Sequence, residues 1–126
     1  MDVRSIINVE PVMEHAGTAP VWWIYKPHEM FEATIGGYLE LVSQSEVQGG
    51  GKVNPHKHPI HEFYYMLQGK GIVQVGDETR EVSQGDLIHI PPNEVHSIWP
   101  ISKNAPINLF IFAIGLKDTP EIDYTT

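Results

Sequence analysis

Four side chains in the middle of the 126-residue chain have the types and spacing of a mononuclear metal site: His56, His58, Glu62 and His96. Residues two apart on an extended strand share a face, so His56 and His58 point the same way. After a turn, Glu62 starts the next extended run, and His96 arrives on a separate strand to close the site. This donor set suits Fe, Mn, Ni, Co, Cu(II) or Zn better than Ca or Cu(I). We therefore predict one divalent transition metal per chain, with coordination positions left open for water or substrate.

The plain alternative is that these four residues are ordinary polar side chains in loops. All four are expected to face the interior of the fold, where an unpartnered carboxylate costs several kcal/mol. A divalent cation offsets that cost. The metal interpretation is therefore favoured.

The elements that must position the site are short. The chain contains 11 Gly and 10 Pro and lacks long stretches with a 3.6-residue hydrophobic period. We expect about eight to ten short antiparallel strands, which is typical of a sandwich or barrel. The expected strands cover residues 21–25, 38–42, 62–67, 72–75, 79–82, 87–90, 95–99 and 107–114. The fold class is therefore all-β, with residues 1–126 as one domain.

Composition excludes several function classes. The chain has a net charge of −8, which argues against a nucleic-acid partner and against an anionic membrane surface. It has no cysteine, so disulfides, zinc–thiolate sites and iron–sulfur clusters are excluded. The N-terminus lacks the apolar core of a signal peptide, and no apolar run approaches the roughly 20 residues of a membrane span. We expect a cytoplasmic protein without a membrane partner.

The same residues carry a family resemblance. Residues 50–69 resemble the first motif of the cupin superfamily, in which a glycine, a His-x-His pair, a glutamate and a second glycine recur at fixed spacing. Gly50, His56, His58, Glu62 and Gly69 occupy these positions. The resemblance implies a small cupin domain of the cupin_2 type, folded as a double-stranded β-helix or jelly-roll β-barrel. It also implies the metal-ligand set given above.

Residues 85–100 resemble the second cupin motif through Gly85, Pro91 and His96. Two positions depart from it. Asn93 stands where the family has glycine, a mild change because asparagine tolerates the left-handed backbone conformation. Pro100 stands where the family often has asparagine, and that position is not a ligand. The metal assignment is therefore unaffected.

Tyr64 is the candidate catalytic residue. If Glu62 faces inward, strand alternation places Tyr64 and Met66 inward as well, and Phe63 and Tyr65 outward. Tyr64 either packs as a wall of the barrel or transfers protons near the metal, where a cation lowers the pKa of a phenol. The sequence here is similar to that of cupin lyases that cleave dimethylsulfoniopropionate, in which the tyrosine two residues after the metal-binding glutamate acts as the base.

Two other histidines lie close to the motifs. His61 neighbours Glu62 and is an alternative ligand, but parity places it on the opposite face of the strand or in the turn before it. His89 alternates within a predicted strand. It is either a pocket residue behind the ligands or a hydrogen-bonded barrel histidine.

Three functions remain open. The first is a metal-dependent enzyme acting on a small organic molecule, as a dioxygenase or as a lyase or isomerase. The second is a non-catalytic cupin that binds or senses a small molecule, and the third is a structural metal that only fastens the barrel. We expect a homodimer, because Trp22 and Trp23 are adjacent and one must point outward, and because cupins are commonly homodimers.

Overall fold

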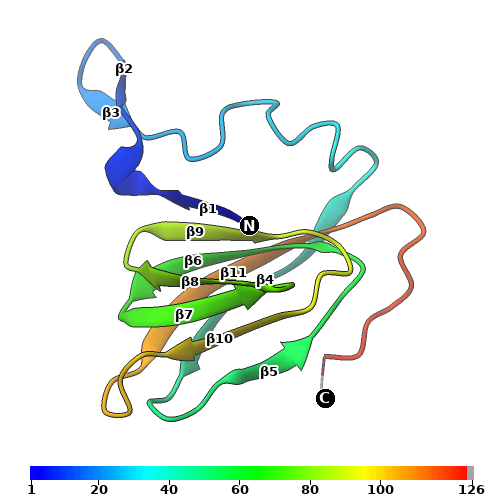
Figure 1. The fold of residues 1–126 in the computed structure, drawn as a ribbon. Helices are drawn as coiled ribbons and strands as arrows, with labels where there is room; N and C mark the ends of the chain where they lie inside the picture. Colours follow the sequence, from blue (N-terminus) through cyan, green and yellow to red (C-terminus); the bar gives the residue numbers. More distant parts are fainter. Residues whose placement is uncertain (125–126) are drawn as a thin grey trace.

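The computed structural model describes residues 1–124 and is built from strands, with a single 3₁₀ turn at Ile6–Asn8. Figure 1 shows two sheets that face each other, with the N-terminal segment on one side of them. The larger sheet has the order β1 (Asp2–Ser5), β9 (Asp86–Ile90), β6 (His61–Gln68), β11 (Ile107–Gly115) and β4 (Tyr38–Val47). The smaller sheet has the order β5 (Val53–His56), β10 (His96–Pro100), β7 (Lys70–Val75) and β8 (Glu78–Ser83). The all-β prediction is confirmed.

The core lies between the two sheets. Alternate residues of the strands point inward and are almost fully buried, as expected where one face of a strand meets the other sheet. The buried cluster contains Val47, Tyr64, Met66, Val73, Val75, Val82, Ile88, Ile90, Ile98, Ile107 and Leu109. The predicted inward direction of Tyr64 and Met66 is thus confirmed. Phe63 points to the other side of the sheet, where it stacks on Phe112 at 4.7 Å between ring centroids.

Two turns of the barrel follow the chemistry of their residues. The hairpin between β7 and β8 pairs Val75 with Glu78 across Gly76-Asp77, and Gly76 has φ +58°. Asn93, at the glycine position of the second motif, has φ +64°, so the left-handed conformation expected there is observed. The backbone N–H of Asn93 donates to the backbone carbonyl of His58 at 2.7 Å. The second motif therefore holds the loop that carries a candidate ligand.

The prediction of a strand over residues 21–25 was wrong. The chain instead forms a small hairpin of β2 (Val12–Glu14) and β3 (Ala19–Val21), which projects away from the two sheets (Figure 1). Beyond Val21 the backbone is irregular, and the indole side chains of Trp22 and Trp23 remain 43% and 39% exposed. Aromatic and β-branched composition favours a strand only where a partner strand is available, and in the structure none pairs with residues 22–25 within residues 1–124.

The C-terminal segment after β11 runs back along the molecule and ends beside β5 (Figure 1). The polar composition of residues 117–126 predicts that this segment covers a rim or a partner subunit. Its described part reaches the rim of the candidate site, as shown below, and residues 125 and 126 lie outside the described residues. No helix among residues 1–124 is long and apolar enough to cross a membrane.

Candidate metal centre

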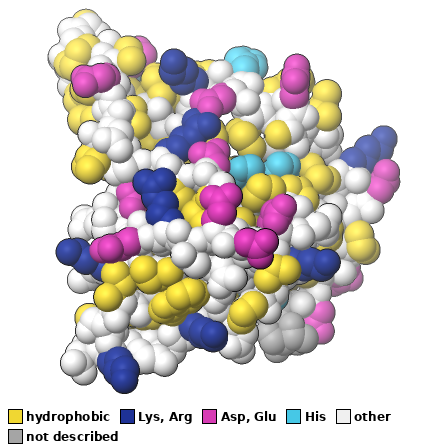
Figure 2. All heavy atoms as spheres, viewed as in Figure 1, with side chains coloured by type: hydrophobic (Ala, Val, Ile, Leu, Met, Phe, Trp, Pro, Cys, Tyr) yellow, Lys and Arg dark blue, Asp and Glu magenta, His cyan; other side chains and the backbone are white. Residues whose placement is uncertain are grey.

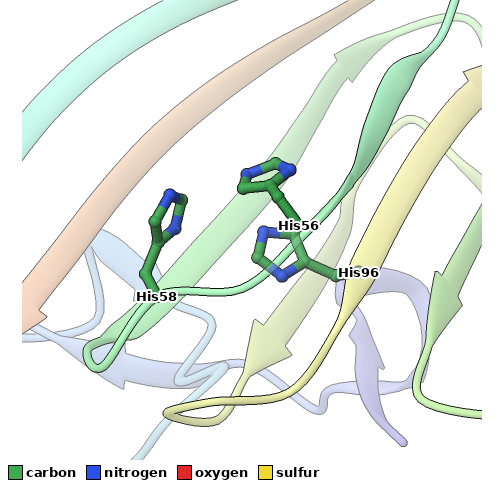
Figure 3. Close-up of side chains that lie close together, drawn as sticks. All are labelled: His56, His58 and His96. Atoms are coloured by element: carbon green, nitrogen blue, oxygen red, sulfur yellow. The ribbon is translucent and has the colours of Figure 1, made fainter. Parts of the chain in front are cut away.

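Three strands and one loop bring the four predicted ligands together. His56 ends β5, His58 lies in the loop before β6, Glu62 is the second residue of β6, and His96 begins β10. His96 and His56 are paired neighbours in the smaller sheet. The ring centroid of His56 lies 4.6 Å from that of His58 and 4.4 Å from that of His96. Figure 3 shows the imidazoles of His56 and His96 beside each other, with that of His58 facing them from its loop.

The three imidazoles are arranged so that they could hold an ion. One nitrogen from each of His56, His58 and His96 lies within 4.8 Å of the others. The remaining ring nitrogens have partners: Nδ1–H of His56 donates to the carbonyl of Asn54 at 2.6 Å, and Nδ1–H of His96 donates to the carbonyl of Glu94 at 2.9 Å. Such bonds to backbone oxygens place the proton on Nδ1 and leave Nε2 as the lone-pair nitrogen that a metal needs.

Glu62 joins the histidines through one carboxylate oxygen. Its Oε1 accepts a hydrogen bond from Nδ1–H of His58 at 3.2 Å and lies 3.2 Å from Nε2 of His96. Burial raises the pKa of the Glu62 carboxyl, but the contacts with His96 and His58 outweigh it, so its pKa lies below the ordinary value. Burial also lowers the pKa of His56. The site therefore presents neutral imidazole at His56 and carboxylate at Glu62, the protonation states that metal ligands require.

One polar atom of this site lacks a partner. Nε2 of His96 is buried and forms no hydrogen bond with any residue among 1–124. With the proton on Nδ1, this nitrogen is an acceptor that faces a second acceptor, Oε1 of Glu62, at 3.2 Å. A buried acceptor left unpaired costs about 1–3 kcal/mol. A cation between the two atoms would remove that cost, so the residues present fit a divalent metal.

A pocket of about 340 Å³ opens onto three of the four predicted ligands, His56, His58 and Glu62. It is lined by Leu41, Ser43, Val53, His56, His58, Glu62, Tyr64, Ile111 and Tyr124. None of these is a lysine or arginine, and aliphatic side chains form much of the wall. A pocket of this size, with an apolar wall and a few convergent polar groups, is typical of a small-molecule site.

Tyr64 lies where strand parity predicted, on the same side of β6 as Glu62, and its ring centroid is 6.0 Å from that of His96. Burial, followed by the Glu62 carboxylate, raises the pKa of Tyr64 well above its ordinary value. In this environment the phenol stays protonated.

Tyr124 is a pocket residue that sequence reasoning missed. Its ring lies 5.3 Å from the ring of His58, and its hydroxyl donates to Glu40 at 3.4 Å. Burial and the Glu40 carboxylate raise the pKa of Tyr124 to about 12. The only sequence signal for Tyr124 is that it is an aromatic residue in a polar C-terminal segment. That signal does not reveal that the segment folds back over the site.

His61 and His89 lie outside the site. As parity predicted, His61 points to the outer face of the larger sheet, where Nε2–H donates to the carbonyl of Ala33 at 2.9 Å. Its Nδ1 lies 2.8 Å from Nε2 of His89. His89 is therefore a hydrogen-bonded histidine, not a group behind the ligands, and neither histidine competes with Glu62.

The fold and site together define a double-stranded β-helix with a cluster of three histidines and one glutamate between its sheets. The Cupin domain model matches residues 43–112 of the chain. The chain therefore belongs to the cupin family, and the resemblance noted from the two motifs is confirmed.

Curated relatives include proteins of several activities. A dimethylsulfoniopropionate lyase of Ruegeria pomeroyi, DddW, is 29% identical over 91 residues, which cover 71% of this chain and 60% of the relative. A gentisate 1,2-dioxygenase of a Haloferax species is 38% identical over 69 residues, 55% of this chain and 17% of the relative. An uncharacterized protein of Methanocaldococcus jannaschii is 36% identical over 74 residues, 58% of either chain. The chain thus spans less than two thirds of the length of these relatives.

Solved structures show the same fold. A Thermotoga maritima protein, described as a predicted oxalate decarboxylase, superposes with a TM-score of 0.59 at 22% identity, covering 92% of this chain and 100% of that one. The cupin domain of Cnp3 from Schizosaccharomyces pombe has a TM-score of 0.56 at 20% identity, covering 59% of this chain and 51% of that one. At these identities the likeness concerns the fold alone.

Proposed function

We propose that His56, His58, Glu62 and His96 hold one divalent transition metal and that the protein is a metal-dependent enzyme acting on a small organic molecule. The observation that carries this proposal is the unpaired Nε2 of His96, buried 3.2 Å from the Glu62 carboxylate. Two buried acceptors in such contact are unfavourable, and a cation or a proton held by both would remove that cost. The atoms lack hydrogen-bond geometry, which favours the cation.

A bound divalent ion supplies Lewis-acid chemistry toward a substrate oxygen. The chain's own residues do the rest. The aliphatic wall formed by Leu41, Val53 and Ile111 excludes water and receives the apolar part of a substrate. Ser43 and Tyr124 offer hydroxyl groups at the same pocket. The lining contains no lysine or arginine, so these hydroxyls are candidate partners for an acidic substrate group.

Tyr64 is our candidate proton-transfer partner. It is two residues after Glu62 on β6, lines the pocket and lies next to His96. The raised pKa described above belongs to the chain without a metal, and a cation held nearby would favour the phenolate. Tyr64 would then accept or return a proton at its hydroxyl oxygen.

We propose that the reaction is that of a dioxygenase or of a lyase or isomerase, and two of these classes occur among the relatives. The named relatives include a gentisate 1,2-dioxygenase, a quercetin 2,3-dioxygenase and a dimethylsulfoniopropionate lyase. Each is a protein that this chain resembles over part of its length. They support enzymatic use of the pocket without selecting the substrate.

The test loads purified protein with Fe(II), Mn(II), Ni(II), Co(II), Cu(II) or Zn(II) in turn. Each form is screened against small carboxylates, phenols and sulfonium compounds for oxygen uptake and for product. Turnover that is lost in His56→Ala supports the enzyme. Metal uptake with ligand binding but no turnover in any form would instead support the non-catalytic binding module, and metal-dependent folding without any ligand would support the structural metal.

We also propose that the protein forms a homodimer through its N-terminal segment. The side chains of Trp22, Trp23 and Phe31 are each more than a third exposed there. Exposed tryptophan is enriched in protein interfaces. Light scattering on wild type and on Trp22→Ser/Trp23→Ser tests the homodimer. We expect the wild type to be a dimer and the variant to be a monomer. A monomeric wild type would contradict the proposal.

A further inference from the structure

A second cavity lies on the outside of the smaller sheet, away from the metal centre. It has a volume of about 350 Å³. Its lining consists of Gly50, Gly51, Lys52, Gln74, Trp99, Pro100, Ile101 and Lys103. Trp99 is three residues after His96 on β10, so the two side chains leave opposite faces of the strand. Nothing in the proposed metal chemistry uses this cavity.

The cavity carries positive charge in an acidic chain. The protein has 16 Asp and Glu residues against 8 Lys and Arg residues, yet the lining contains Lys52 and Lys103 and no carboxylate. Within residues 1–124, neither lysine forms an ion pair with a carboxylate. Nζ of Lys52 lies 6.0 Å from the ring centroid of Trp99. On the face shown in Figure 2, dark blue Lys and Arg side chains border a yellow apolar patch toward the lower left.

The two loops that form the cavity are fixed against each other. A Cβ at position 49 would overlap the carbonyl oxygen of Lys103, so glycine lets the β4–β5 turn pack directly on the segment after β10. Gly51 N–H donates to the carbonyl of Gln48 at 2.9 Å, and Ile101 N–H donates to the carbonyl of Lys70 at 3.0 Å. A cavity held in this way needs little ordering to receive a ligand.

We propose that this cavity is a binding site for a small aromatic carboxylate. The indole of Trp99 offers a flat apolar surface on which an aromatic ring can stack. Lys52 and Lys103 offer ammonium groups for one carboxylate, and the side chain of Gln74 lies at the same wall. The volume lies at the lower end of the range for small-molecule sites. Both an apolar ring and a negative charge are therefore required of the ligand.

The test uses 1-naphthoate as the probe and ¹⁵N-labelled wild-type protein. The chain has three tryptophans, so three indole N–H signals report separately on Trp22, Trp23 and Trp99. We expect 1-naphthoate to shift the Trp99 signal in a saturable way, also in His56→Ala, which disables the proposed metal centre. Failure of the enzyme proposal thus leaves this result untouched.

Matched variants and probes decide the outcome. Lys52→Ala/Lys103→Ala is expected to weaken 1-naphthoate binding at least about fivefold, whereas Arg80→Ala, which removes an exposed charge from β8, changes it less than about twofold. The neutral 1-naphthalenemethanol is expected to bind at least about fivefold more weakly than 1-naphthoate. Equal weakening in both charge variants, equal binding of both probes, or no shift at Trp99 would each overturn the proposal.

Discussion

Nδ1 of His61 lies 2.8 Å from Nε2 of His89, and the two rings stack with an angle of 17° between their planes. The pair joins β6 to β9 on the outer face of the larger sheet. Since His61 donates to the carbonyl of Ala33, its Nδ1 is the acceptor and His89 is the donor. The pair thus fastens the irregular N-terminal segment to the sheet directly behind the strand that carries Glu62.

Removal of His89 alone is expected to destabilise the protein. His89→Phe keeps an aromatic ring beside Phe63 but leaves the buried Nδ1 of His61 without its donor, at a cost of about 1–3 kcal/mol. Urea unfolding of wild type and variant measures this loss of stability. His61→Phe/His89→Phe removes both polar groups and is expected to recover part of the loss. A double variant that is less stable by the sum of the two single changes would show that the histidines do not act as a pair.

The His89 imidazole also makes stability depend on pH. Burial, followed by the neighbouring His61, lowers the pKa of His89 to about 4. The unfolded chain, with a pKa of about 6.5, binds this proton first as pH falls. The stability that His89 contributes is therefore complete above pH 6.5 and is lost as pH falls toward 4. Between pH 7 and 5, the urea midpoint is expected to fall more steeply in wild type than in His89→Phe, and equal slopes would contradict this.

His96→Leu tests the cost of the unpaired ligand nitrogen. In metal-free protein this variant is expected to be more stable than wild type by about 1 kcal/mol, because a buried acceptor is replaced by an apolar side chain of similar size. Added metal then stabilises only the wild type, by about 2.7 kcal/mol at 100 times Kd. Thermal unfolding with and without metal measures both effects. A variant that is destabilised without metal would show that His96 is satisfied by other means.

Tyr64→Phe separates packing from chemistry. The ring that fills the core is retained, so the fold and the metal content are expected to be unchanged. Turnover of an identified substrate is expected to fall about 10²–10⁴-fold, the range for a lost general acid or base. The control is Tyr65→Phe on the outward side of the same strand, which is expected to keep full activity. Equal activity of Tyr64→Phe and wild type would remove the proton-transfer role.

Strand alternation and turn preferences correctly predicted those features of the fold that depend on residues close together in the sequence. Alternation along β6 correctly separated Tyr64 from Phe63, and Asn93 adopts the left-handed conformation expected at the glycine position of the second cupin motif. Residues 21–25 were wrongly predicted as a strand because pairing depends on where a partner strand lies. The reach of Tyr124 over the pocket and the pairing of His61 with His89 depend equally on contacts between distant segments, which a single sequence does not contain.

Elemental analysis of untagged protein, purified without a chelator, tests the central claim most directly. We predict about one equivalent of a divalent transition metal per chain in wild type. Glu62→Gln and His96→Ala are expected to hold much less, and Lys57→Ala, beside two of the ligands, is expected to keep the full amount. Less than about a tenth of an equivalent in wild type, with no uptake when metals are titrated back, would contradict the metal centre.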